Sequence, residues 1–142
     1  RQIVTEHEFS NHSSRIKEKF RHMIQHGGRI PPRFRTKKFS QKLLPERWED
    51  GALPNITVTA MPDDYVHYRR PRSLSVREWA RLQSFPDHHV FCGKRTTGGS
   101  RRAGNPSKGD WSREVPKYTQ VGNAVPPLMA KAIGVHCSNI LT

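Results

Sequence analysis

The stretch Arg72-Ser-Leu-Ser-Val-Arg-Glu-Trp-Ala-Arg-Leu-Gln-Ser-Phe-Pro-Asp87 carries the clearest structural signal in the chain. Within it, Ser75-Val-Arg-Glu78 has the form of a capping box, in which the serine hydroxyl accepts a hydrogen bond from the glutamate N–H and the carboxylate reaches back. Pro86 cannot continue a helix, because it lacks an N–H and its ring clashes with the preceding turn. We therefore expect a helix over roughly residues 76–84. Four residues share its expected buried face: Val76, Trp79, Ala80 and Gln83.

Two further helices are expected on either side of this stretch. Near residues 13–26, apolar residues recur at the spacing of one helical face: Ile16, Phe20, Met23 and Ile24. Either Asn11 or Ser13 can cap the start of this helix, and Gly27-Gly28 ends it. At the other end of the chain, Pro126-Pro127 opens a last helix. Its buried side is expected to carry Leu128, Met129, Ala132 and Ile133.

The segments between these helices are less regular. Residues 29–54 are rich in Pro, Arg and Lys and predict irregular structure. Residues 55–60 alternate apolar and polar side chains and predict a strand, and residues 65–67 predict a second one after a turn at 62–64. Residues 93–114 combine Gly with Lys and Arg, which is the composition of a mobile basic loop. A DNA clamp and a solvated linker are equally open interpretations of that loop.

Charge is the strongest bulk signal. The 142 residues contain 25 Lys and Arg against 12 Asp and Glu, a formal net charge of +13. Such a surplus repels itself unless a polyanion is near, and nucleic acid is the usual partner. A solubilising surface, or a basic fragment of a larger protein, is the plainer alternative.

Several classes of protein are disfavoured. The chain has no apolar run of membrane-spanning length and no signal-peptide pattern, so we expect a soluble, cytoplasmic protein that contacts no membrane. Its two cysteines, Cys92 and Cys137, are far apart, which argues against both a zinc site and a disulfide framework. The eight histidines are scattered without a metal-ligand spacing, so we expect no metal.

Two segments resemble a known enzyme family. Residues 72–87, followed by Tyr118-Thr-Gln-Val-Gly-Asn-Ala-Val-Pro-Pro127, are similar to the last two sequence motifs, commonly numbered nine and ten, of DNA cytosine-5 methyltransferases. The main departure is Trp79, where the family usually has a small residue. Upstream, Leu53–Ala60 resembles the family's P-S-x-T-I-T-A stretch, and Asn11-His12 with Arg15 resembles an N-H-x-x-R opening. The resemblance runs from about residue 10 to 136.

The resemblance implies roles for particular residues. In the family, the turn made here by Gly122, Asn123, Ala124 and Val125 lies against S-adenosyl-L-methionine. The side chain of Asn123 and the backbone of Val125 would contact the methionine part of this cofactor. The free N–H groups of the helix that follows are suited to its carboxylate.

Other residues are assigned to DNA binding or to support of the target-recognition region: Arg72, Arg77, Arg101 and Arg102. We interpret Arg77 as structural and leave Arg72 open between the two roles. Gln83 and Asp87 are expected to bond backbone groups.

The same resemblance indicates what the chain does not carry. In the family, a cysteine thiolate in a Pro-Cys loop attacks C6 of a flipped cytosine, and the methyl group then moves to C5. Neither this loop nor the family's Glu-Asn-Val and Phe-x-Gly-x-Gly segments occurs here. The flanking residues of Cys92 and Cys137 do not fit a nucleophile, and we expect both to be buried. We therefore predict no catalytic residue in this chain, and no activity without the catalytic N-terminal region or subunit of the same enzyme.

Together these interpretations predict an α+β fold, a small mixed domain of short strands with a C-terminal helix, which is part of a larger two-lobed, Rossmann-like methyltransferase. Residues 1–70 would belong to the target-recognition region, 71–92 to the motif-nine helix, 93–117 to the basic loop, and 118–142 to motif ten and the last helix. Double-stranded DNA is the expected substrate, in a bacterial restriction-modification system, and an exposed last helix would invite oligomerisation. An autonomous nucleic-acid-binding module and an assembly protein are the competing hypotheses.

Overall fold

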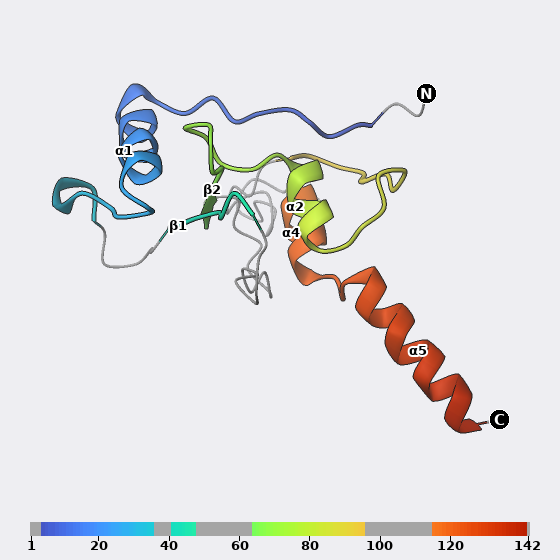
Figure 1. The fold of residues 1–142 in the computed structure, drawn as a ribbon. Coiled ribbons are helices and arrows are strands. Elements are labelled where there is room, and N and C mark those ends of the chain that lie inside the picture. Colours follow the sequence, from blue (N-terminus) through green and yellow to red (C-terminus); the bar gives the residue numbers. More distant parts are fainter. Residues whose placement is uncertain (1–3, 36–40, 48–63, 96–114, 142) are drawn as a thin grey trace, which may run out of the picture. The chain divides into compact units, whose positions relative to one another are not determined.

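A computed structural model describes residues 4–35, 41–47, 64–95 and 115–141. These residues form two compact units (Figure 1). Unit 1 comprises residues 4–7, 76–95 and 115–141, and unit 2 comprises residues 8–35, 41–47 and 64–75. The predicted strand at 55–60 and most of the predicted basic loop lie outside the described residues.

Unit 2 is built around helix α1, Ser14–Gln25. Of the two candidate caps, Ser13 takes the role, because its side chain accepts a hydrogen bond from the Ile16 N–H at 3.4 Å. Gly27 and Gly28 follow the helix with φ of +59° and +87°, values that favour glycine, so the predicted helix and its glycine stop are both confirmed. Phe20 and Met23 are the buried residues of the predicted apolar face.

A short parallel strand pair completes the core of unit 2. Strand β1, Lys42–Leu43, pairs with strand β2, Tyr65–Val66 (Figure 1). Val66 is fully buried against Phe20 and Met23 of α1. The strand predicted at 65–67 is thus present and one residue shorter. The prediction of irregular structure throughout 29–54 is wrong, because this segment contains β1 and a 3-10 turn η1, Pro32–Phe34.

Unit 1 is centred on helix α2, Val76–Leu82, which packs against helix α4, Lys117–Asn123. The four residues of the predicted α2 face are all buried, and Trp79 is fully enclosed. The side chains that meet them from the rest of the unit include Phe91, Tyr118 and Val121, which are also buried. The helix ends before the predicted residue 84, since Ser84 adopts a left-handed conformation with φ of +60°.

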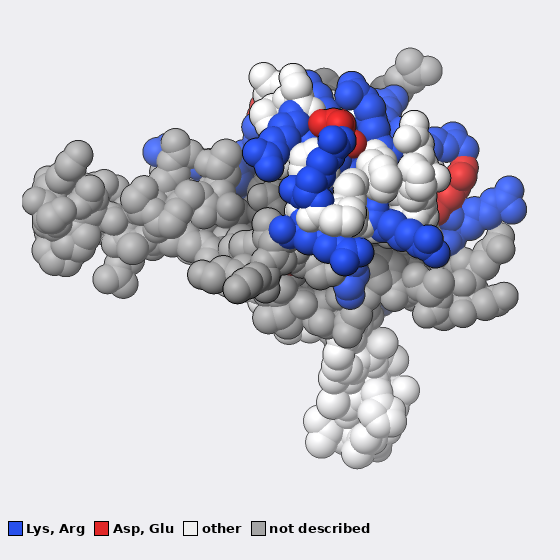
Figure 2. Space-filling view, turned by 90° about the vertical axis from the view of Figure 1, so that its left-hand side faces the viewer, with Lys and Arg blue, Asp and Glu red and all other residues white. Residues whose placement is uncertain are grey.

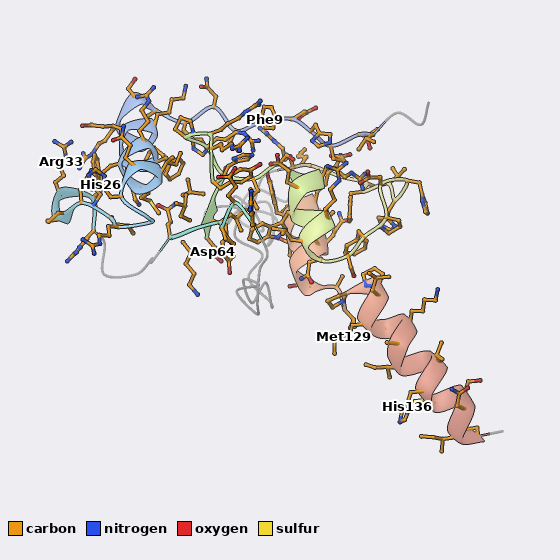
Figure 3. The ribbon with its side chains drawn as sticks, viewed as in Figure 1. Phe9, His26, Arg33, Asp64, Met129 and His136 are labelled. Atoms are coloured by element: carbon orange, nitrogen blue, oxygen red, sulfur yellow. The ribbon has the colours of Figure 1, made fainter. Side chains whose placement is uncertain are left out.

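The last helix, α5, runs from Pro127–Leu141 as the proline pair predicts. None of its residues is buried. The apolar side that would be buried in the whole enzyme is exposed in this chain by itself, as predicted: Leu128, Met129 and Ile133 are 67%, 56% and 50% exposed. Figure 3 shows Met129 and His136 extending from α5. A helix that is apolar on most sides normally lies within a larger protein.

The described elements are helices and very short strands, which agrees with the predicted α+β class. Among the residues that the structure describes, no helix is long and apolar enough to cross a membrane.

Candidate functional site: the pocket between α4 and α5

A pocket of about 390 Å³ lies where α4 ends and α5 begins. Its lining comes from three pieces of unit 1: α2's end, the α4–α5 connection and the first turn of α5. The lining residues are Gln83, Gly122, Asn123, Ala124, Val125, Pro126 and Met129. The four cofactor-binding residues expected from the sequence are thus brought together in one pocket.

The backbone at this pocket differs from the expected turn. Gly122 and Asn123 are the last two residues of α4, and the chain leaves the helix at Ala124, with φ of −79° and ψ of +146°. A residue before a proline is driven toward extended backbone, and the prolines at 126 and 127 impose this on Val125 and Pro126. The turn is therefore displaced by two residues, with Gly122 buried and Asn123 exposed.

The start of α5 offers fewer free N–H groups than expected. Pro127 has none, and the Leu128 N–H donates to the Ser84 hydroxyl oxygen at 3.1 Å. The Ala130 N–H donates to the Pro126 carbonyl at 3.0 Å. The idea that these first N–H groups all stay free for a carboxylate is wrong for Leu128. Ser84 instead caps α5 from the end of α2.

One wall of the pocket is held firmly and the other is open. The Gln83 amide donates to the Val121 carbonyl at 3.5 Å, which confirms the predicted backbone contact of Gln83 and ties α2 to α4. On the other side, Val125 and Met129 are 61% and 56% exposed. The described residues therefore form one face of a pocket, with apolar surface left uncovered beside it.

Three polar residues that sequence reasoning did not identify support α4 from its beginning. The Gln120 amide donates to the carbonyls of Cys92 and Val115, at 2.7 and 2.8 Å. The ammonium of Lys117 pairs with the Glu6 carboxylate at 2.7 Å, and both side chains are largely shielded from water. Since 111 residues separate this pair, no local sequence pattern could have predicted it.

Of the four arginines assigned to DNA binding or support, the structure describes two, and both are buried. Arg77 is fully buried, and its guanidinium donates to the carbonyls of Thr5, Pro86 and His89, which confirms the structural interpretation. Arg72, left open between two roles, is 9% exposed, lies 4.0 Å from the Phe9 ring centre and donates to the Ser73 carbonyl. These contacts favour support over DNA binding. Arg101 and Arg102 lie outside the described residues.

Two smaller expectations are corrected. Among the described residues, the Asp87 carboxylate forms a bidentate pair with Arg81, at 2.8 and 2.7 Å, in place of the expected backbone contact. The Arg81 hydrogen bonds lower the pKa of the Asp87 carboxyl below its ordinary value. Cys92 and Cys137 are both exposed rather than buried. Within the described ranges, no group of three or more His, Cys, Asp or Glu side chains could hold a metal ion.

Comparison with known proteins decides the family. A family model described as C-5 cytosine-specific DNA methylase matches residues 2–139. The chain belongs to this methylase family. The match includes the whole pocket and both motifs that carry the resemblance.

Curated relatives agree with the assignment. The type II methyltransferase M1.HphI of Haemophilus parahaemolyticus is 35% identical over 133 residues, which are 92% of this chain and 30% of that protein. The type II methyltransferase M.DdeI of Desulfomicrobium norvegicum is 40% identical over 86 residues, 60% of this chain and 18% of that protein. This methylase chain therefore spans less than a third of the length of these two relatives.

One relative is of similar size. The type II methyltransferase M.AquIB of a Picosynechococcus strain is 32% identical over 131 residues, which are 92% of this chain and 84% of that protein. No solved structure gives a significant match to the chain.

Proposed function

We propose that this chain supplies the C-terminal part of a DNA (cytosine-5-)-methyltransferase, with one wall of the cofactor pocket and part of the DNA-binding surface. The observation that carries the proposal is the pocket between α4 and α5, which gathers Gly122, Asn123, Ala124 and Val125 in a chain of the methylase family. In this account, residues 118–142 bind the cofactor and anchor the chain. Residues 71–92 brace them, and residues 1–70 with the basic segment 93–117 serve target recognition.

The pocket fits part of S-adenosyl-L-methionine. Its volume of about 390 Å³ lies at the lower end of the range for ligand sites, and its lining is mainly apolar with a few polar groups. The exposed amide of Asn123 can both donate to and accept from an amino-acid group, and the backbone of Val125 lies beside it. When bound, the cofactor supplies the electrophilic methyl group; this chain's residues bind and orient it.

The pocket is open on one side and α5 is exposed. Both features favour a second region of protein that packs against this chain. The chain contains no Pro-Cys loop, so the thiolate that attacks cytosine must come from elsewhere. We propose that α5 packs against a Rossmann-like lobe that carries this loop, and that this lobe closes the pocket over Val125 and Met129. M.AquIB, of which the matched residues make up 84%, is a relative of about the same length as this chain.

The test measures cofactor binding in the joined enzyme. The full chain is mixed with a polypeptide carrying the family's earlier motifs, such as the region encoded upstream, and the KM for S-adenosyl-L-methionine is determined. Loss of one net hydrogen bond, worth about 0.5–1.5 kcal/mol, predicts that Asn123→Ala raises this KM by about 2- to 12-fold. Asn11→Ala, an exposed asparagine in unit 2, is the matched control and should leave the KM unchanged. Equal KM values for both variants would remove Asn123 from the cofactor site.

A further inference from the structure

The α1–η1 end of unit 2 gathers exposed cations around one aromatic ring. The guanidinium carbons of Arg15, on α1, and Arg33, on η1, lie 5.7 and 5.0 Å from the centre of the Phe34 ring. Phe34 itself is buried, whereas both arginines are exposed. Stacking on the ring restricts the long side chains, so their charges are held in place at the surface rather than free to move.

Two histidines extend this surface along α1 to its C-cap residue, His26. The rings of His22 and His26 are stacked, with centres 4.0 Å apart and planes 15° from parallel. On a helix, residues 15, 22 and 26 follow one flank, since they are separated by whole turns. The pKa of His22 is lowered by desolvation, then by His26 and by Arg33. Figure 3 shows His26 and Arg33 at this end of unit 2.

Acidic groups are sparse here. Glu18 pairs with Arg33, whereas Arg15 forms no ion pair with any residue in the described part of the chain. Figure 2 views unit 2 from this side and shows Lys and Arg side chains spread across it with few Asp or Glu. Arg72 is buried and so is not part of this surface, to which Arg15 and Arg33 contribute exposed positive charge.

We propose that the surface formed by Arg15, His22, His26 and Arg33, hereafter the α1–η1 surface, binds the phosphate backbone of duplex DNA. The inference rests on the proposed function for the choice of ligand. Guanidinium groups match phosphate oxygens in charge and geometry, and such contacts fix the register of a protein on the duplex without reading its sequence. A methylase needs such contacts with the DNA backbone in addition to the contacts that select its target base.

The experiment measures binding of the full chain to a labelled duplex of A·T pairs only, so that recognition of a target cytosine cannot contribute. The variant is Arg15→Gln/Arg33→Gln, and the matched control is Arg81→Gln/Lys131→Gln, two exposed cations of unit 1 that lie outside the segments assigned to target recognition and give the same loss of charge. Each phosphate contact contributes a slope of about 0.9 to the dependence of log affinity on log salt. Losing two contacts should therefore reduce the affinity ratio between about 50 and 200 mM salt by about 12-fold.

A third variant guards against simple unfolding. Glu18→Gln removes the carboxylate that competes with phosphate for Arg33, so it should tighten binding, which a damaged fold cannot do. Circular dichroism of each variant checks the helices directly.

The proposal is overturned if the Arg15/Arg33 variant and the Arg81/Lys131 control lose the same salt dependence, or if Glu18→Gln binds no tighter than the wild-type chain. Tighter binding of single-stranded RNA or of anionic vesicles than of the duplex would overturn it as well. None of these results depends on methyl transfer, so they leave the KM test of Asn123 to decide the proposed function separately.

Discussion

Replacing Arg77 by glutamine should lower the free energy of unfolding of unit 1 far more than the loss of an exposed charged side chain does. The Arg77 guanidinium is fully buried and donates to the carbonyls of Thr5 at 3.1 Å, Pro86 at 3.1 Å and His89 at 2.7 Å. A glutamine amide is shorter and can reach at most one of these acceptors. At least two of these part-buried, charge-assisted hydrogen bonds are then lost, at a cost of about 1–3 kcal/mol each.

The expected loss is thus about 2–6 kcal/mol, a large share of the roughly 5–15 kcal/mol that holds a typical domain together. Urea unfolding followed by far-UV circular dichroism measures it as a fall in the midpoint at unchanged slope. Arg81→Gln is the control, because its pair with Asp87 is half-exposed and such pairs contribute about 0–1 kcal/mol. If the two variants were equally stable, Arg77 would not be the structural centre that its contacts indicate.

Three other outcomes follow from the described contacts. Trp79→Ala should destabilise the chain by about 3–5 kcal/mol in urea melts, because the indole is fully enclosed; a smaller loss would mean that the site collapses around alanine. The lowered pKa of Asp87 means that its pair with Arg81 stabilises the fold above the ordinary carboxyl value of 3.8, and that this contribution is lost as the pH falls through the lowered value. The stability difference between wild type and Asp87→Asn should therefore vanish in acid, and a constant difference would contradict the pairing. Ile133→Lys should leave the isolated chain's unfolding midpoint unchanged, since Ile133 is half-exposed, but should weaken co-purification with the catalytic region; unaltered association would place the interface elsewhere.

The helices were largely predictable because their signals are local. The apolar spacing in α1, with a serine before it and glycines after it, is complete within 16 residues of sequence, and its bounds agree with Ser14–Gln25 to within a residue. The buried face of α2 follows from helical geometry in the same way. The proline at the start of α5 favours a helix start through its own fixed φ angle, without any tertiary contact.

What depended on distant partners was not predictable. Strand β1 has only two residues, and it is defined by pairing with β2 about twenty residues further along the chain. Helix α4 escaped prediction because it is seven residues long and ends in Gly122-Asn123, two residues that disfavour helices. The residues that hold α4, such as Glu6, come from the far end of the chain.

The candidate site shows the same division. The motif Gly122–Val125 could be predicted from sequence, by resemblance, as a cofactor-binding segment, and the structure places its residues in the lining of one pocket. The backbone conformation of this motif and the burial of Arg72 and Arg77 could not be predicted. The sequence does not distinguish an arginine that faces phosphate from one that is buried in the core. Only burial and hydrogen-bond partners separate these roles.

The central claim is that this chain and a separate catalytic region make one methyltransferase. The direct measurement is mass spectrometry of 5-methylcytosine in duplex DNA incubated with labelled S-adenosyl-L-methionine and the chain, the upstream polypeptide, or both. The account predicts methylated cytosine only with both polypeptides present. Methylation by the upstream polypeptide at full rate without this chain, or none from the mixture although the two associate and bind DNA, would contradict it.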